Sequence, residues 1–343
     1  MELLKRLSET AGVPGHEGAV REVLREALAE STSTIETDHL GNLIARCGGS
    51  GPSVTIAAHM DEIGFLVRHV EKETGFVRLE PLGGFDPRVL VAQRVSIHAE
   101  GGPLVGCVGS KPVHALATED RKKPLELKDL FVDVGMCGES VRERVVIGDP
   151  ITLRQEFLTY GDIVSGKALD DRVGIYIGVE AIRRSERIAC DLTFVGTTQE
   201  EVGLRGARVA GYASKPEIGI ALDVTLAMDV PGVEEAERVT RLGEGVAIKL
   251  KDSASISHPG LVRAMRRLAE EREIPYQMEI LPRGGTDAGA LQMANEGAAV
   301  VTLSVPTRYV HSVVETAHRN DIEAAIALLS AFLENADRID LST

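Results

Sequence analysis

The sequence has 343 residues, of which 43% are hydrophobic, 26% are charged and only 3% are aromatic. This balance is that of a globular protein and excludes disordered and fibrous chains, and the length suits about two domains at roughly 150 residues each. The formal charge of -14 and the absence of Trp argue against a nucleic-acid-binding protein, because a phosphate backbone is held by clustered basic residues and bases stack on aromatic ones.

The beginning of the sequence, MELLKRLSETAGVPGHE, carries charges within its first apolar stretch and has no small-residue cleavage site, so we expect no secretory signal there. No apolar run approaches the ~20 residues that span a bilayer. The cysteines are far apart and form no CxxC pair, which argues against a zinc ribbon and a disulfide framework. They are Cys47, Cys107, Cys137 and Cys190. We therefore expect a cytoplasmic protein.

The first predicted elements are a helix and a strand. A helix is predicted over residues 17–30, where one face comprises Val20, Val23, Leu24, Ala27 and Leu28. A strand is predicted over residues 54–58 and ends at His59. From about residue 63 to residue 162, short apolar runs alternate with Gly, Pro and Asp, and only residues 139–145 favour a helix. This pattern predicts a small β-rich unit.

The alternation of strands and helices returns after this unit. Helices are predicted over 172–186 and 259–272, and strands over 192–197, 217–223 and 298–304. A last helix is predicted to open at Asn320 as its cap, with Glu323 three residues further on. The simplest interpretation is one α/β domain made of residues 1–63 and 163–343, interrupted by an inserted β-rich domain at 64–162.

Acids and histidines follow these predicted strands, where open α/β sheets keep their ligand sites. A lone residue of this kind is usually a surface or hydrogen-bonded residue, but several at successive strand ends predict a metal site. Imidazole and carboxylate without thiolate suit Zn, Co or Mn. The residues are His59 in AHMDEIG, Glu200 and Glu201 in TTQEEVGLRGA, Asp223 in ALDVT and His311 in VPTRYVHS, joined by Asp170 and Asp171 in GKALDDRVG.

The ordered segments AHMDEIGF, GKALDDR, TTQEEVGLRGA, GGTDAGA and VPTRYVHS resemble the motif set of the M42 aminopeptidases, over nearly the whole chain. That family contains deblocking and glutamyl aminopeptidases and the tetrahedral peptidases. The resemblance implies a three-layer α/β/α catalytic domain of the zinc-peptidase type with a mixed sheet. It also implies an inserted small β-barrel or PDZ-like dimerisation domain, and homo-oligomers from dimers to tetrahedral dodecamers.

The resemblance further implies two divalent metal ions, Zn or Co, in each subunit. Asp170 would bridge them, Glu201 and His311 would complete one site, and His59 and Asp223 would complete the other. Two divalent cations, three carboxylates and one bridging hydroxide together carry no net charge, which helps a buried site to form.

Glu200 would then be the general base that takes a proton from the metal-bridging water and passes it to the leaving amine. Asp61, two residues after His59, resembles the acid that orients a metal-binding imidazole, although it could instead cap a loop. The implied reaction is release of the first amino acid from peptides with a free N-terminus. The preferred first residue, the native metal and the final assembly stay open.

Other functions remain as alternatives. A metal-dependent deacylase or amidohydrolase could use the same scaffold. A glycoside hydrolase would need two acids and no metal, and His59, His311 and the scarcity of aromatic residues argue against it. A non-catalytic metal-binding or assembly protein is disfavoured because Glu200 accompanies a full ligand set.

Several further residues have competing interpretations. GDIVSGK at 161–167 fits the GxxxxGK frame of a phosphate-binding loop, but Ala168 replaces the required hydroxyl residue. Thr286 and Asp287 either line the substrate cleft or cap a helix, and His114 is either a turn residue or an interface residue. The histidines without a partner motif are predicted to be ordinary surface or sheet residues: His39, His69, His98 and His318.

Overall fold

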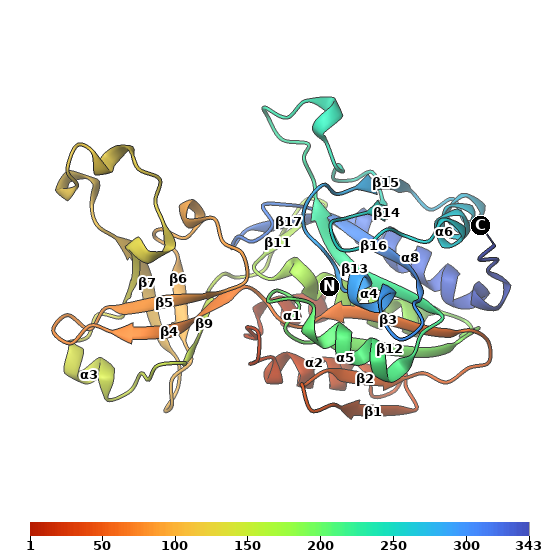
Figure 1. The fold of residues 1–343 in the computed structure, drawn as a ribbon, viewed down its shortest axis with the longest axis horizontal. Helices are drawn as coiled ribbons and strands as arrows, with labels where there is room; N and C mark the ends of the chain where they lie inside the picture. The colour runs from red at the N-terminus through yellow and green to blue at the C-terminus, as the bar shows by residue number, and fades with distance from the viewer. Residues whose placement is uncertain (343) are drawn as a thin grey trace.

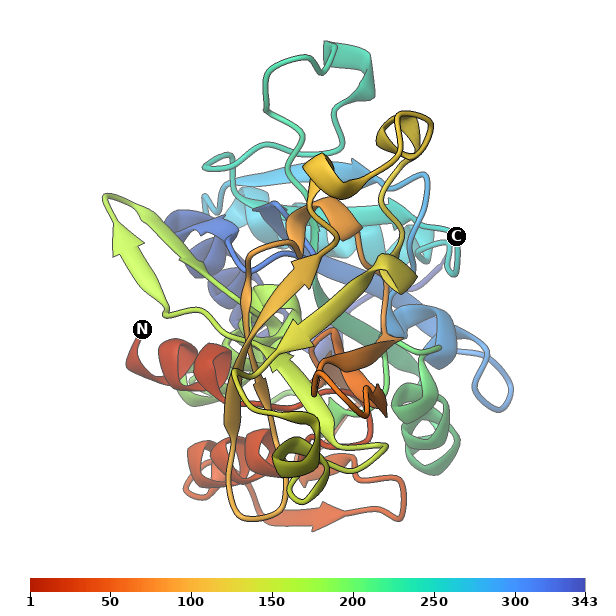
Figure 2. The same cartoon turned by 90° about the vertical axis from the view of Figure 1, so that its left-hand side faces the viewer.

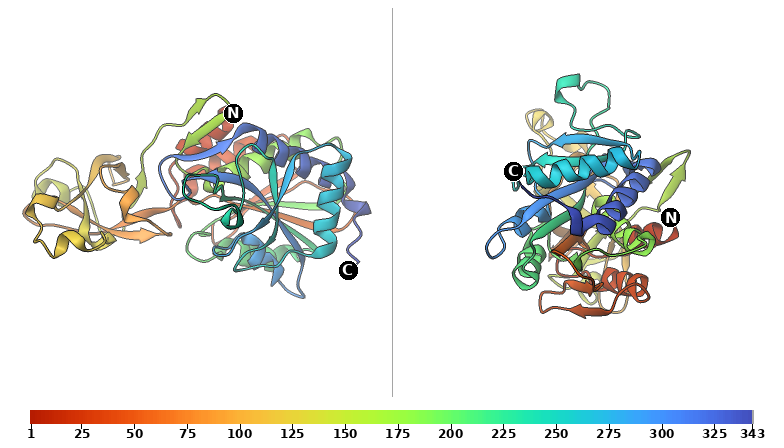
Figure 3. Two further views of the ribbon diagram at one scale, coloured as in Figure 1. Left: turned by 90° about the horizontal axis from the view of Figure 1, so that it is seen from above. Right: turned by 90° about the vertical axis from the view of Figure 1, so that its right-hand side faces the viewer.

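The computed structural model describes residues 1–342 and shows a large α/β body beside a small β-barrel (Figure 1). Seen from above, the barrel stands clear of the larger body and is joined to it by a narrow waist (Figure 3). Both ends of the chain belong to the larger body. Among the described residues, no helix combines the length and the apolar character that crossing a membrane requires.

The larger body is built on an eleven-stranded mixed sheet. Its main path is β1 (Thr34–Thr37), β2 (Leu43–Arg46), β12 (Asp191–Thr197), β3 (Ser53–His59), β13 (Ile218–Leu226), β16 (Ala299–Arg308), β17 (Glu315–His318), β11 (Ile163–Gly166) and β10 (Leu158–Tyr160). Off this path, β14 (Val246–Lys251) pairs with β16 and with β15 (Tyr276–Ile280). The central strands β12, β3, β13 and β16 are parallel neighbours, so their carboxyl ends meet at one edge of the sheet.

Helices cover both faces of this sheet. Alternate residues of the central strands point to opposite faces, and they pack in two different apolar clusters. Ile56 and Ile220 pack in the large core, whereas Ala57 and Ala221 pack in a small cluster with helix α7. The helices on the large-core face are α1 (Glu2–Glu9), α2 (Gly18–Leu28), α4 (Leu169–Arg184), α6 (Pro259–Glu271) and α8 (Arg319–Asn335). The other face carries α5 (Arg205–Ser214) and α7 (Asp287–Gln292). This arrangement is the predicted three-layer α/β/α fold.

The inserted unit is a closed six-stranded barrel. Its strands, in spatial order, are β4 (Gly64–Val70), β5 (Val77–Leu82), β8 (Leu130–Asp133), β7 (Leu104–Ser110), β6 (Arg94–Ile97) and β9 (Pro150–Leu153). Helix α3 (Gly138–Arg142) lies beside it, as Figure 2 shows from the barrel side. The short 3-10 helices of the chain are η1 (Pro87–Val89), η2 (Val113–Ala115), η3 (Asp120–Lys122), η4 (Leu127–Asp129), η5 (Glu235–Glu237) and η6 (Ala336–Arg338).

The barrel has its own apolar core, and β10 lies within the predicted insertion but pairs with β11 in the large sheet. We keep residues 64–162 as a proposed domain, with 1–63 and 163–343 as the proposed catalytic domain.

The predicted amphipathic helix is confirmed, because all five residues of its apolar face are buried in α2. The predicted cap of the last helix is wrong. Helix α8 begins at Arg319, and the ring Nδ1 of His318 accepts a hydrogen bond from the backbone N–H of Asn320 at 3.1 Å. His318 therefore caps the helix, a role that its lack of a sequence motif concealed.

Candidate functional site

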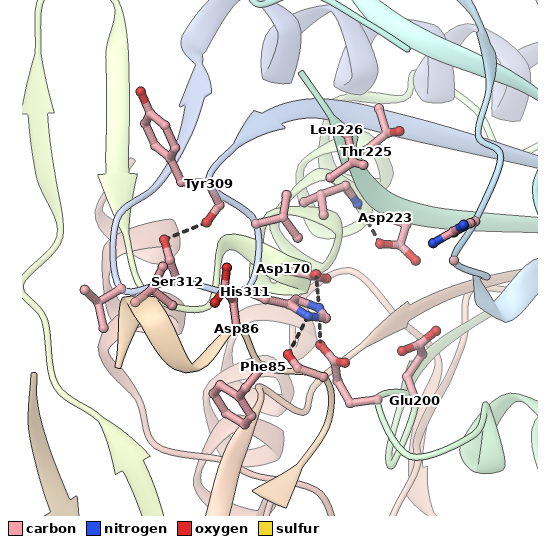
Figure 4. A pocket seen from close by; sticks show the side chains of 18 of the residues that line it. Phe85, Asp86, Asp170, Glu200, Asp223, Thr225, Leu226, Tyr309, His311 and Ser312 are labelled. Carbon is pink, nitrogen blue, oxygen red and sulfur yellow. Dashed lines mark hydrogen bonds and ion pairs between the residues drawn. The ribbon is translucent and has the colours of Figure 1, made fainter. Parts of the chain in front are cut away.

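A cleft of about 1140 Å³ lies between the barrel and the larger body, at the carboxyl edge of the parallel strands. The segment between β5 and β6, which includes Phe85 and Arg88, forms one wall, and the large sheet supplies the other. Figure 4 shows acidic and histidine side chains pointing toward one another in this cleft. The predicted site residues that line it are His59, Asp170, Glu200, Glu201, Asp223 and His311.

Strand ends deliver most of these side chains. His59 is the last residue of β3, and Glu200 and Glu201 follow β12 after a turn at Gln199, which has a φ of 55°. Asp223 lies inside β13, three residues before the strand ends. His311 lies in the connection from β16 to β17, also at positive φ.

Asp170 stands at the centre of the group. Its Oδ1 lies 3.1 Å from Nε2 of His59, and its Oδ2 lies 3.3 Å from Nε2 of His311. The side chain projects from the start of α4, where the dihedral angles of Asp170 and Asp171 are not helical. One carboxylate therefore contacts both imidazoles, one with each of its oxygens.

The two adjacent glutamates face different histidines. Oε1 of Glu201 lies 3.3 Å from Nε2 of His311, whereas Oε2 of Glu200 lies 4.0 Å from Nε2 of His59. Atoms of His59, Asp170 and Glu201 all lie within 4.8 Å of one another, close enough to hold one ion. His311 belongs to the same group, because its Nε2 lies 3.3 Å from both Asp170 and Glu201, and Glu200 lies at its edge.

Asp223 lies close enough to Asp170 for the charges of the two carboxylates to interact. Burial raises its pKa well above the ordinary value, and the nearby Asp170 carboxylate raises it further. One of its oxygens accepts a hydrogen bond from the backbone N–H of Val224 at 2.7 Å. Its position in the cleft beside Asp170 is seen in Figure 4.

Asp61 lies outside the cleft and is completely buried behind it. Its two carboxylate oxygens accept hydrogen bonds from the backbone N–H groups of Glu200 and Glu201, at 3.0 and 3.1 Å. Its backbone carbonyl lies 2.9 Å from Nδ1 of His59, and its Oδ1 lies 3.7 Å from the same nitrogen. The Asp61 carboxylate therefore holds the loop that carries both glutamates, and its backbone carbonyl, rather than its carboxylate, lies within hydrogen-bond distance of the imidazole.

The carboxylates of the group are buried close together. Burial raises the pKa of Glu200 well above its usual value and also raises that of Glu201. Burial opposes protonation of His311, but hydrogen bonds with Asp170 and Glu201 raise its pKa to about 12. Buried carboxylates crowded in this way repel one another. Imidazole and carboxylate groups that face one pocket form a ligand set that fits a divalent transition metal.

Sequence reasoning missed two groups that position His311 and Asp170. The carboxylate of Glu315 accepts hydrogen bonds from the backbone N–H groups of Asp170 at 3.0 Å and His311 at 2.8 Å. The carbonyl of Gly84 lies 2.8 Å from Nδ1 of His311. The acid four residues after His311 was a visible signal for Glu315, but no pattern connects Gly84 with His311 across the chain.

The other candidate residues lie away from the cleft. Lys167, the lysine of GDIVSGK, is buried, and its Nζ donates to both carboxylate oxygens of Glu62 at 2.7 and 2.8 Å. Thr286 and Asp287 are also buried, and the cleft is lined instead by the preceding segment, residues 283–285. His114 lies in η2 on the barrel side.

Comparison with known proteins gives one family. A family profile described as "M42 glutamyl aminopeptidase" matches residues 41–328. The chain is 37% identical over 349 residues to the lysyl aminopeptidase of Pyrococcus furiosus, covering 99% of each chain. It is 31% identical over 320 residues to the glutamyl aminopeptidase of Lactococcus lactis, covering 90% of this chain and 88% of the other.

Solved structures agree with this match. The aminopeptidase APDkam598 of Desulfurococcus kamchatkensis superposes with a TM-score of 0.93 at 37% identity, over 97% of this chain and 94% of the other. The TET1 peptidase of Pyrococcus horikoshii, described as assembling into a tetrahedron or a large octahedral shell, superposes with a TM-score of 0.86 at 33% identity. That match covers 97% of this chain and 98% of the other.

Proposed function

The chain belongs to the M42 family of aminopeptidases, which are hydrolases acting on peptides, and on that basis we propose that it is a two-metal enzyme releasing the first amino acid from peptides. One observation carries the proposal. The two oxygens of Asp170 lie within 3.3 Å of the Nε2 atoms of His59 and His311, the arrangement expected of a carboxylate shared by two cations.

We assign the remaining ligands around this bridge. Glu201 and His311 would complete one metal site, because their side chains already meet at 3.3 Å. His59 and Asp223 would complete the other. When bound, two Zn or Co ions would polarise the substrate carbonyl, lower the pKa of a water molecule and receive the free amino terminus.

Glu200 is the proposed general base. Its carboxylate lines the cleft beside His59 but lies farther from the imidazole than Asp170 does, so it is left free to move a proton. Burial raises its pKa, which makes the carboxylate a stronger base toward water, and the carboxyl formed can then return the proton to the leaving amine. Asp61 holds the Glu200 backbone and so fixes the direction of the carboxylate.

We also propose a homo-oligomer, since the TET1 peptidase with the same fold assembles into closed shells. A shell of this kind would admit peptides and exclude folded proteins. The four cysteines are all free, which supports the proposed location in a reducing cytoplasm.

The decisive experiment assays a panel of aminoacyl reporter substrates with metal-free protein to which Zn or Co is returned. We expect activity to require metal, and the panel to reveal the preferred first residue. Matched peptides with free and acetylated amino termini separate the aminopeptidase from the deacylase or amidohydrolase alternative. Preferential cleavage of the acetylated peptides would contradict the proposal.

The glycoside hydrolase alternative is tested with the same preparation. Its mechanism needs two acids and no metal. Hydrolysis of a polysaccharide that survives chelation, with peptides left intact, would replace our proposal with this one.

A further inference from the structure

A second cleft, of about 860 Å³, lies on the seam between the barrel and the larger body and shares no lining residue with the first. Strands β6 and β9 of the barrel form one side, and α1 together with the segment leading into β10 forms the other. Its lining is mostly polar and contains no residue of the proposed catalytic group.

Two arginines face each other in this cleft. The antiparallel register pairs Val95 with Leu153, so Arg94 and Arg154 occupy the next pair of opposite positions, and the backbone N–H of Arg154 donates to the carbonyl of Arg94 at 3.0 Å. Like charges placed directly opposite on neighbouring strands destabilise a sheet. Both arginines are exposed, and within the described chain neither guanidinium group makes a hydrogen bond or an ion pair.

The rest of this face of the ladder is also made of donors. Ser96 lies opposite Thr152, and the ring Nε2 of His98 lies 2.8 Å from the Thr152 hydroxyl. The alternate residues, such as Val95 and Ile97, are buried in the barrel core. The outward face of β6 and β9 is therefore a polar strip of guanidinium, hydroxyl and imidazole groups.

The free charges of the cleft favour an anion. Lys5, Arg94 and Arg154 stand against the carboxylates of Glu9 and Glu156, and the Glu9 carboxylate already accepts a hydrogen bond from the backbone of Phe157 at 3.0 Å. The charge of Lys167 is compensated by Glu62 and is not available. The three available cations outnumber the two carboxylates, so this cleft carries net positive charge on a chain of charge -14.

We propose that this cleft binds a small phosphate compound with more than one phosphoryl group, through Arg94 and Arg154. Guanidinium groups are planar forks that bind phosphate oxygens in pairs, and a bound anion would remove the repulsion between the two arginines. A ligand with a single carboxylate fits less well, because its two oxygens cannot accept from all the donors of two guanidinium groups and two hydroxyls. The volume suits a ligand larger than one oxyanion.

Calorimetry with inorganic pyrophosphate tests this, using the full-length, metal-loaded protein dialysed free of unbound metal. We expect the Arg94→Gln/Arg154→Gln double variant to bind pyrophosphate at least tenfold more weakly than the wild type. The matched control is Arg144→Gln, an exposed arginine of the barrel outside the cleft, which should bind normally. Any pyrophosphate held at the metal centre persists in all three proteins, so only the difference reports the cleft.

Further arms separate the competing occupants. Single phosphate should bind more weakly than pyrophosphate, and citrate tests whether carboxylates serve equally well. Equal affinity of the wild type and the double variant, or tighter binding of citrate than of pyrophosphate, overturns the proposal. Sedimentation measures the assembly size of the same proteins. If the double variant differs in size from the wild type and pyrophosphate binds to neither, the proposal is wrong and a second copy of the chain occupies the cleft.

Folding is controlled by thermal unfolding of each variant. Because removing both charges relieves a like-charge pair, the double variant should unfold at the same temperature as the wild type or higher. Pyrophosphate should raise the unfolding temperature of the wild type and leave that of the double variant nearly unchanged. An equal rise in both proteins would also contradict a site at these arginines.

Discussion

The Oδ1 atom of Asp61 accepts a hydrogen bond from the backbone N–H of Glu200 at 3.0 Å, although 139 residues separate them in the chain. The other oxygen serves Glu201 in the same way. A single buried carboxylate therefore fixes the loop on which the proposed base and a proposed metal ligand are neighbours. This contact joins the end of β3 to the end of β12.

The first prediction concerns this contact. In Asp61→Asn only one side-chain oxygen remains as an acceptor, so one of the two N–H groups loses its partner. We expect kcat to fall by about 10- to 100-fold, as is typical when a group supporting a metal ligand is altered. Steady-state kinetics check this against Asp191→Asn, an exposed aspartate at the far end of β12. Unchanged kcat in Asp61→Asn would reduce the residue to a loop cap.

Glu200→Gln separates proton transfer from metal binding. The amide retains the shape of the side chain but cannot take a proton, so kcat should fall by about 10²- to 10⁴-fold while the metal content stays at the wild-type value. Elemental analysis and kinetics on the same sample give both quantities. Glu296→Gln, at an exposed position, is the matched control, and normal turnover in Glu200→Gln would remove the residue from the mechanism.

Glu201→Gln, unlike Glu200→Gln, should lose bound metal and lose activity as a result. Its carboxylate meets His311 at 3.3 Å, so its loss should reduce the bound metal from about two ions per chain toward one. Activity should then recover in part when excess metal is added. If Glu201→Gln keeps all of its metal while Glu200→Gln loses it, the roles of the two glutamates are exchanged.

The stability of the protein should depend on pH through Asp321, which is remote from the metal centre. Burial raises its pKa to about 6, although the backbone N–H groups of Gly243 and Gly245 donate to it. The folded protein therefore holds this proton more tightly than the unfolded chain, and its stability falls as pH rises from about 4 to about 6.

Asp321→Asn should flatten this decline by up to about 3 kcal/mol, the free energy that corresponds to the rise of the Asp321 pKa to about 6. Urea unfolding at several pH values measures how the free energy of unfolding of each variant changes with pH. A hydrogen bond lost in the amide lowers the stability equally at every pH, so it does not affect this slope. The exposed-site variant Asp191→Asn should retain the wild-type slope. A slope that stays the same in Asp321→Asn would contradict the expectation.

Arg172 is predicted to anchor the N-terminal segment. It is completely buried and donates to the backbone carbonyls of Leu7, Thr10 and Met60. A guanidinium nitrogen of Arg172 also lies 3.5 Å from Oε1 of Glu62. Arg172→Met leaves the three carbonyls without a donor and part of the Glu62 charge without a partner, which should cost about 3–5 kcal/mol. Thermal unfolding and proteolysis of the first residues measure the loss. Arg208→Met, at an exposed position of α5, should have little effect.

The sequence reveals the buried strands well and the exposed ones poorly. Strands β3, β13 and β16 are long and buried on both faces, so their continuous apolar runs are visible without a structure. Strands β1 and β10 are short and almost wholly exposed. Their pairing depends on neighbours that are distant in the sequence, and no local pattern predicts it.

The residues of the candidate site also divide into those that the local sequence reveals and those that depend on distant segments. His59 and the adjacent glutamates could be found because strand ends converge at one edge of a parallel sheet. Which histidine meets which acid is implied only by the family resemblance and not by the residue pattern, since the contact of His311 with Asp170 depends on the connection from β16 folding back over the cleft. The contact of His311 with Gly84 depends on how the barrel sits against the larger body.

The position of β3 in the sheet constrains how the chain folds during synthesis. Its two neighbours, β12 and β13, leave the ribosome only after the entire barrel has been made. The barrel strands are contiguous in sequence and can close as a unit, while β3 waits with both edges unpaired. Exposed strand edges are sites of aggregation, so the nascent chain passes through an interval in which an apolar strand of the future sheet centre is open to wrong pairing.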